Sequence, residues 1–246
     1  MTRWIRVIGI GAGPPDQITI EAVDALRSVD WFITADKGPG DPLLAAREAL
    51  LAQHVGEGST VVAVRDPERD RADPADYLAA VTDWHDARAE AYERAILDRD
   101  GDVGFLVWGD PAFYDSTIRI VQKVLERGNV DVEWDVIPGI SSLQLLAARH
   151  RIVLHEIGQP IAITTGRRLR ESIAAGADNL VVMLNSRLEL DGLDDWQIWW
   201  GANLGTAHER LVSGPVGEVV GELDDARAAV KAAAGWVMDV YLLRRP

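Results

Sequence analysis

The sequence predicts an α/β protein with two α/β domains: an N-terminal, mostly parallel sheet with helices and a C-terminal mixed sheet. In the first half, short apolar runs alternate with helical stretches, the order typical of a parallel sheet covered by helices. After Pro138-Gly139 this alternation changes, and two later apolar runs are joined only by LGTAH, which is short enough for a hairpin. We therefore expect domains over 1–139 and 140–246, with the active site in the crevice between them.

Each element of the first half has a local signal. Thr19 is an expected N-cap, and Asp41 is a second one that places Pro42 at the first helical position. A glycine ends the fourth expected helix, as is common. Strands are expected over 4–10, 31–35, 60–64, 103–108 and 132–137, and helices over 19–29, 41–52, 77–97 and 116–128.

The second half begins with a helical stretch, SSLQLLAARH, directly after the change of pattern. Apolar runs then return, and a long stretch with helical spacing precedes the last of them. Strands are expected over 160–165, 179–185, 197–203, 209–214 and 236–243, with a helix within 216–234.

Composition narrows the classes of function. The 246 residues are 48% hydrophobic and 26% charged, typical of a folded, soluble protein, and no apolar run approaches the ~20 residues of a membrane span. The N-terminus lacks a signal-peptide core, so we expect a cytoplasmic protein. Cysteine is absent, which excludes disulfides and thiolate metal sites. The net charge of −14 argues against a nucleic-acid partner.

Histidines give no sign of a metal site. His150, His155 and His208 do not have metal-ligand spacing, so we expect no bound metal. His155 could donate a proton, although a histidine without a motif around it is more often structural.

The opening stretch, VIGIGAGPPDQIT, has the glycines of a nucleotide-binding turn but not its full fingerprint. A dinucleotide loop needs a third glycine where this chain has Pro14, and Pro14 and Pro15 remove backbone donors where a phosphate would sit. Asp36 comes close to the usual ribose-binding position without matching it. Two interpretations remain: a tight turn without a ligand, or a loop that binds a ligand without phosphate.

Two further stretches bear on that choice. VWGDPAFYDST, at 107–117, and VIPGISSLQLLAAR, at 136–149, each follow or complete a predicted strand and carry turn residues. Loops at the carboxyl ends of parallel strands meet at one edge of the sheet. We therefore expect all three glycine-bearing loops to lie together.

Together the three loops resemble the tetrapyrrole methyltransferase family, which uses S-adenosylmethionine. The resemblance rests on Gly9, Gly11 and Gly13; on Gly109-Asp110-Pro111; and on Pro138-Gly139-Ile140-Ser141-Ser142, in the family's order and on the expected elements. A family methionine in a strand after the domain join matches Met183. Four stretches resemble the members of the family that act in cobalamin biosynthesis: GIGAGPPDQIT, ADKG, GDPAFYDST and ITTGRRL. This resemblance implies an enzyme that methylates carbon 1 of precorrin-5 and releases acetate.

The resemblance implies a set of donor-binding residues. Asp110 and Tyr114 are positioning candidates, but Asp110 could equally cap the following turn, and the two serines could cap a helix. The family loop commonly reads Gly-Pro-Gly-Asp-Pro, and Pro14 replaces its aspartate here, so any chemistry of that aspartate is lost. The implied contacts to S-adenosylmethionine are Gly11, Ala12, Gly109, Asp110, Phe113, Tyr114, Ser141, Ser142 and Met183.

A tetrapyrrole carries many carboxylates, so a strongly acidic protein needs local positive charge to bind it. Arg167 and Arg168 follow a strand and a glycine, and guanidinium groups suit carboxylates. Lys37 and Arg187 are further candidates, whereas Arg170 is expected to be a surface charge. We also expect a homodimer.

Other functions remain open at this point. One is another tetrapyrrole or diphthamide-type methyltransferase of the same family. Another is a non-catalytic ligand-binding or scaffold protein on the same fold. A nicotinamide-dependent oxidoreductase is disfavoured by Pro14.

Overall fold

The structure is a computed structural model that describes residues 3–36, 42–67 and 77–246. Its internal contacts divide the chain into two compact units, Met1–Ile140 and Ser141–Pro246. Lys37 and Asp41, which the sequence singled out, lie outside the described residues.

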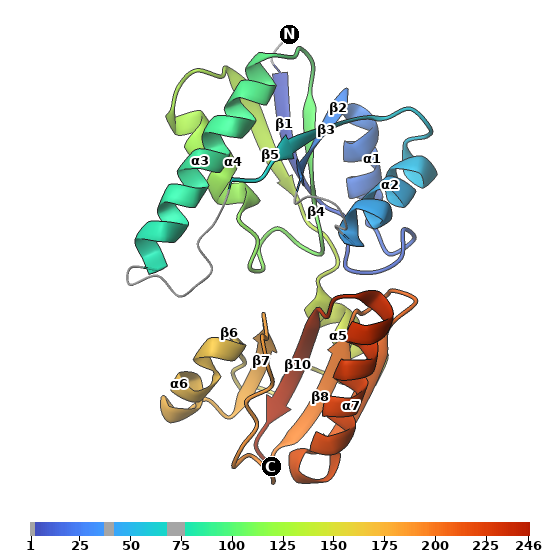
Figure 1. The fold of residues 1–246 in the computed structure, drawn as a ribbon, viewed down its shortest axis with the longest axis vertical. Coiled ribbons are helices and arrows are strands. Elements are labelled where there is room, and N and C mark those ends of the chain that lie inside the picture. The colour runs from blue at the N-terminus through green and yellow to red at the C-terminus, as the bar shows by residue number, and fades with distance from the viewer. Residues whose placement is uncertain (1–2, 37–41, 68–76) are drawn as a thin grey trace. The chain divides into compact units, whose positions relative to one another are not determined.

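In the first unit, the described residues form a five-stranded sheet with the order β3-β2-β4-β1-β5 (Figure 1). Every neighbouring pair in it is parallel, as the alternation of strands and helices predicted. The strands are β1 (Arg3–Gly9), β2 (Trp31–Asp36), β3 (Thr60–Arg65), β4 (Val103–Val107) and β5 (Val132–Ile137).

Helices cover both faces of this sheet, because successive residues of a strand point to opposite sides. Ile5 and Val7 of β1 pack in a core with α3 and α4, whereas Ile8 packs in a second core with α1 and α2 (Figure 1). Thr19 caps α1 as expected, its hydroxyl accepting a hydrogen bond from the Ala22 amide at 3.0 Å. The helices are α1 (Ile20–Ser28), α2 (Pro42–His54), α3 (Tyr77–Leu97) and α4 (Thr117–Glu126).

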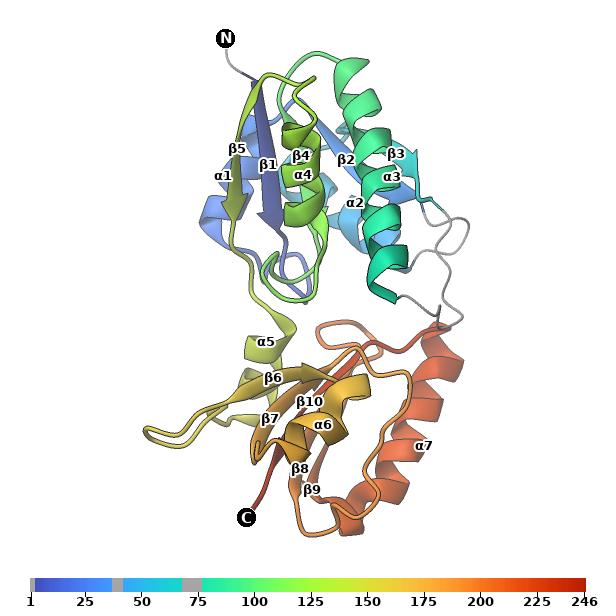
Figure 2. The same cartoon turned by 90° about the vertical axis from the view of Figure 1, so that its left-hand side faces the viewer.

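The second unit has a mixed sheet with the order β6-β7-β10-β8-β9 (Figure 2). β6 and β7 are parallel, and the other neighbouring pairs are antiparallel, including the expected β8–β9 hairpin. The elements are α5 (Ser142–His150), β6 (Ala162–Thr165), a 3-10 turn (Gly166–Arg168), α6 (Leu169–Ala174), β7 (Asn179–Met183), β8 (Gln197–Ala202), β9 (Arg210–Pro215), α7 (Val216–Ala234) and β10 (Asp239–Arg244).

The main core of this unit lies between the sheet and the helices α6 and α7. Leu169 of α6 and Leu223 of α7 are fully buried against Trp200 and Tyr241 from the sheet. α5 packs on the other face, where a Cβ at Gly201 would lie 3.0 Å from the Leu146 side chain. The sheet is therefore covered on both faces.

Some boundaries differ from those expected. The last strand begins at Asp239 and not at 236, because its first ladder partner is Ala202, the last residue of β8. The strand expected from 160 begins at Ala162, and Pro160 has no amide to give to a ladder. The short helix α6 is not among the helices expected from the sequence. Within the described part of the chain, no helix is both long and apolar enough to cross a membrane.

Candidate functional site

Three loops meet through backbone hydrogen bonds at the carboxyl edge of the first sheet. Gly11, after β1, and Gly109, after β4, exchange hydrogen bonds of 3.1 and 2.9 Å between their amides and carbonyls. The amide of Ala12 donates to the carbonyl of Ile140, after β5, at 3.1 Å. β4, β1 and β5 are adjacent in the sheet, so their following loops are brought together by the strand order.

This contact is possible only because the loops carry glycines. A Cβ on Gly139 would lie 2.1 Å from the carbonyl oxygen of Gly109, and one on Gly9 would lie 2.5 Å from the Gly139 nitrogen. Gly11 has a φ of +80°, in the left-handed region that favours glycine. The glycines are therefore required by close backbone approach, whether or not a ligand is bound.

Asp110 joins two of these loops through both of its carboxylate oxygens. Oδ2 accepts a hydrogen bond from the Gly139 amide at 2.9 Å, and Oδ1 accepts one from the Ala112 amide at 2.8 Å. The second contact is the turn-capping role that the sequence left open. The first reaches 29 residues along the chain and fixes the loop after β4 to the loop after β5. Asp110 thus holds the shape of this edge, and contact with a donor stays a prediction.

The first loop has few amides left for an anion. Gly11 and Ala12 donate to other loops, Gln17 donates to the Pro14 carbonyl, and two of the remaining residues are prolines. The loop is also anchored from α2, where Nε2 of His54 lies 2.7 Å from the Pro15 carbonyl oxygen. Phosphate recognition through a row of backbone amides is therefore poorly supported here.

Aromatic residues follow Asp110 on the same loop. Phe113 is half-buried, and its amide donates to the Asp110 carbonyl at 3.3 Å. Tyr114 is 44% exposed and has a φ of +53°, uncommon for a residue other than glycine. Unusual backbone of this kind is enriched at ligand sites, but also occurs in tight turns.

The two serines after Gly139 lie at the start of α5. Ser141 is 2% exposed, and its hydroxyl accepts a hydrogen bond from the Gln144 amide while the Gln144 side chain accepts one from the Ser141 amide. This reciprocal arrangement is a capping box. Ser142 is the first residue of the helix and is half-buried. The capping role is thus observed for Ser141, and donor contact by either serine stays a prediction.

The arginines expected to bind carboxylates are exposed in the second unit. Arg167 and Arg168 lie in the 3-10 turn after β6. Arg168 forms a bidentate ion pair with Glu171, in which Nε donates to Oε2 at 2.9 Å and Nη2 donates to Oε1 at 2.6 Å. Hydrogen bonding from Arg168 holds the pKa of the Glu171 carboxyl below its usual value. Arg187 pairs with Glu189, with Nε and Nη2 both 2.9 Å from Oε1 of that carboxylate. A substrate carboxylate would therefore compete with acidic side chains of this chain.

The structure also places three other residues that the sequence singled out. Met183 is the last residue of β7 and is half-buried. Arg170 is exposed and donates to the Asp191 carbonyl at 2.5 Å, as suits a surface charge. His155 is exposed, with Nδ1 3.0 Å from the Glu156 carbonyl oxygen. Among the described residues, no group of three or more His, Cys, Asp or Glu side chains could hold a metal ion.

One polar cluster was not anticipated from the sequence. Arg227, Asn185 and Trp200 all donate to the carboxylate of Asp239, a buried residue. The only local sign was an aspartate within the apolar run WVMDVYLL. A buried carboxylate needs such partners, but the sequence does not say which residues supply them.

Fold and loops together define a two-unit α/β protein with three interlocked glycine-bearing loops at the edge of its first sheet. Residues 5–220 match the model of the tetrapyrrole (corrin/porphyrin) methylases, and the chain belongs to this family. The family resemblance drawn from the three loops is therefore confirmed.

Curated relatives extend over almost the whole chain. Precorrin-6A synthase (deacetylating) of Sinorhizobium sp is 44% identical over 250 residues, which cover 99% of this chain and 95% of that protein. A probable cobalt-precorrin-2 C(20)-methyltransferase of Methanocaldococcus jannaschii is 26% identical, with 89% and 90% covered.

Solved structures agree on the fold. A putative cobalamin synthesis related protein (CobF) from Corynebacterium diphtheriae has a TM-score of 0.86 and 36% identity, covering 100% of this chain and 99% of its own. Uroporphyrin-III C-methyl transferase from Thermus thermophilus, complexed with S-adenyl homocysteine, has a TM-score of 0.59 and 19% identity, covering 98% and 91%. The second likeness bears on the fold alone.

The close approach of the loops gives a first prediction. Gly139→Ala should lower the free energy of unfolding by ~1–3 kcal/mol, because its methyl group would overlap the Gly109 carbonyl and force the backbone apart. Thermal and urea unfolding would measure the change. Gly221→Ala in α7 is the control: its Cβ has open space, and alanine is favoured in helices, so stability should stay equal or rise. Equal stability of Gly139→Ala and wild type would contradict the tight contact.

Proposed function

We propose that this chain is an S-adenosylmethionine-dependent C-methyltransferase of cobalamin biosynthesis. It methylates carbon 1 of precorrin-5 and, with one water consumed, releases the two-carbon fragment as acetate, giving precorrin-6A. The observation that carries the proposal is the 44% identity to a precorrin-6A synthase (deacetylating) over 99% of this chain and 95% of that relative. The interlocked loops on which the family resemblance rests are all present in the structure.

The site chemistry is compatible with a sulfonium donor. S-adenosylmethionine carries a positive sulfur and no phosphate, so it does not need the free amides that the first loop lacks. In methyl transfer, a nucleophilic ring carbon bonds to the methyl carbon as the carbon–sulfur bond breaks. The electron pair of that bond stays on sulfur, which becomes neutral. Such an in-line displacement depends mainly on how the protein positions the two reactants.

In this scheme, the residues of this chain bind and orient the methyl donor. Gly11, Ala12 and Gly109 would present backbone to the donor, while Asp110 keeps the two loops together. Phe113 and Tyr114 would cover the donor, and the proposed contacts include Ser141, Ser142 and Met183. The crevice expected from the sequence stays a prediction.

The macrocycle would be recognised by positive charge against an acidic background. Arg167, Arg168 and Arg187 are exposed, and guanidinium groups bind carboxylates with two parallel hydrogen bonds. Lys37 remains part of the proposal from the sequence alone. We also propose a cytoplasmic homodimer; light scattering in solution would test the dimer.

The decisive experiment incubates the purified protein with S-adenosylmethionine and precorrin-5. Mass spectrometry should detect a methylated macrocycle that has lost its two-carbon fragment, with one acetate released per turnover. Methylation without acetate would point to another methyltransferase of the family. No turnover and no thermal stabilisation by S-adenosylhomocysteine would favour a non-catalytic protein. Stabilisation by NAD alone would favour an oxidoreductase.

Asp110 gives a second prediction. Asp110→Ala should weaken S-adenosylhomocysteine binding by ~1–3 kcal/mol, because the Gly139 and Ala112 amides lose their acceptor and the loops separate. Isothermal titration calorimetry would measure it. Asp115→Ala is the matched control, since the Asp115 carboxylate accepts a local hydrogen bond from the Thr117 amide at the start of α4. Unchanged affinity in a folded Asp110→Ala protein would limit Asp110 to a capping role.

Arg167 and Arg168 give a third prediction, which separates the two substrates. Replacing both with alanine should weaken macrocycle binding by ~1.5–3 kcal/mol per lost charge-assisted contact if the contacts are partly buried, and by less if they stay exposed. Affinity for S-adenosylhomocysteine should stay nearly the same. Added salt should weaken macrocycle binding more in the wild type than in the double variant.

The control for this pair is Arg170→Ala, which removes an exposed arginine two residues further along the chain. It should leave both affinities close to those of the wild type. Normal macrocycle binding by the double variant would contradict the assignment. An equal loss of donor affinity would show a damaged fold or a misplaced site.

A further inference from the structure

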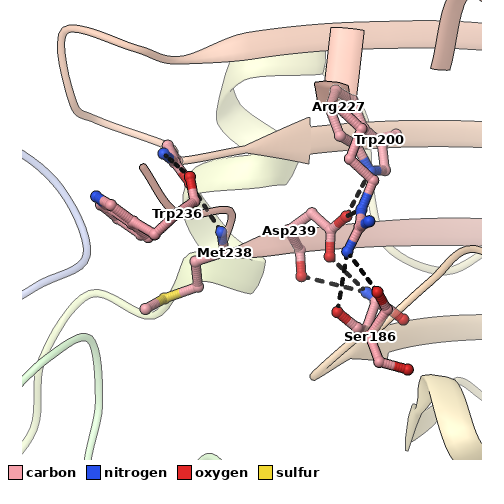
Figure 3. A network of polar contacts seen from close by, with 8 residues as sticks. Ser186, Trp200, Arg227, Trp236, Met238 and Asp239 are labelled. Atoms are coloured by element: carbon pink, nitrogen blue, oxygen red, sulfur yellow. Dashed lines mark hydrogen bonds and ion pairs between the residues drawn. The ribbon is translucent and has the colours of Figure 1, made fainter. Parts of the chain in front are cut away.

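A buried carboxylate organises the start of β10 in the second unit (Figure 3). The side chain of Asp239 is 1% exposed. Its Oδ2 accepts hydrogen bonds from Nε of Arg227 at 2.8 Å and from the indole N–H of Trp200 at 3.3 Å. Its Oδ1 accepts one from the Asn185 side-chain amide at 3.0 Å. Three elements, α7, β8 and the segment after β7, therefore converge on one side chain.

Arg227 does more than neutralise this carboxylate. Its Nη2 donates to the backbone carbonyls of Asn185 at 3.2 Å and Ser186 at 3.0 Å (Figure 3). Nε and Nη2 of one planar guanidinium are thus used at once, on a carboxylate and on two main-chain oxygens. A lysine has one nitrogen and cannot reproduce this fixed arrangement.

The backbone held by Arg227 has an unusual shape. Leu184, between Met183 and Asn185, has a φ of +55° and is 61% exposed, so core packing does not hold its side chain in place. A leucine in the left-handed region is strained and persists only where its surroundings impose it. The contacts of Asn185 and Ser186 with Arg227 are such surroundings.

The same segment also touches the turn that carries the exposed arginines. A Cβ on Gly166, the first residue of that turn, would lie 2.6 Å from Oδ1 of Asn185. The position of Asn185 therefore limits where the backbone before Arg167 and Arg168 can run. The partly buried ion pair of Arg227 and Asp239 therefore influences both the end of β7 and the turn after β6.

Stability alone is a weak reason for this arrangement. A buried ion pair loses hydration, and apolar residues of similar volume are often as stabilising. What an apolar replacement could not supply is the pair of hydrogen bonds to the carbonyls of Asn185 and Ser186.

We propose that Arg227, held in place by Asp239, is a positioning residue that fixes the segment 184–187 and thereby Met183 for binding the methyl donor. This rests on the proposed function, which places Met183 at the donor. Arg227 itself acts through the main chain of the segment and does not touch the reacting atoms.

The test compares Arg227→Lys with Arg244→Lys. Arg244 is a matched control at the opposite end of the same strands: it donates to the Asn179 side chain, to the Val153 carbonyl and to the Glu156 carboxylate. Both substitutions keep the positive charge and lose the planar guanidinium. The side chains are similarly buried, 22% and 18% exposed.

Donor affinity and amide hydrogen exchange are measured for the wild type and both variants. Calorimetry should give about tenfold weaker S-adenosylhomocysteine binding for Arg227→Lys, the order expected from lost hydrogen bonds, and no change for Arg244→Lys. Hydrogen exchange without ligand should speed up at the amides of 184–187 only in Arg227→Lys. Asp239→Asn, which removes the charge that orients Arg227, should act in the same direction and serves if Arg227→Lys folds poorly.

The outcomes separate this proposal from the proposed function. Wild-type protein that does not bind S-adenosylhomocysteine would overturn both. Wild-type binding with unchanged affinity in Arg227→Lys would overturn the positioning role alone. Equal losses in Arg227→Lys and Arg244→Lys would also overturn it, because a general loss of stability would then explain the effect.

Discussion

The candidate site depends on close contact between main chains at the edge of the first sheet. Gly11 and Gly109 pair as strands do, and Gly139 lies so close that a methyl group would overlap the Gly109 carbonyl. This contact engages the amides of Gly11 and Ala12, which a phosphate-binding loop would offer to its ligand. The glycines that make the loop resemble a nucleotide site also allow this close contact, which makes the loop unsuited to phosphate. The edge of the sheet is lined by backbone and suits a donor without phosphate.

Charge is the second constraint on the molecule. With a net charge of −14, exposed arginines find acidic neighbours within their own chain, as Arg168 and Arg187 do. Such exposed pairs contribute little to stability, so an incoming carboxylate can replace them at small cost. A polycarboxylate substrate would then replace the acidic side chains that already pair with these arginines. Because such contacts are exposed, salt should weaken them.

The two units use carboxylates in a similar way. Asp110 fixes loops through backbone amides, and Asp239 fixes the segment after β7 through Arg227. Both side chains act on main-chain geometry next to expected ligand contacts, and neither needs to take part in chemistry. This agrees with a reaction in which positioning supplies most of the protein's contribution.

The sequence by itself determined most of the elements and the family. α3 has the expected bounds and α7 lies in the stretch expected to hold a helix, because long stretches with helical spacing are clear in local sequence. The first sheet is parallel, as the strand–helix alternation predicted. The three glycine-bearing loops were found because each follows or completes a strand and carries a recognisable motif. Only tertiary structure decided which atoms meet: Asp110 with the Gly139 amide, Arg227 with Asp239, and β10 between β7 and β8. Such contacts join residues far apart in the chain, and local patterns carry no information about partners that only folding brings together.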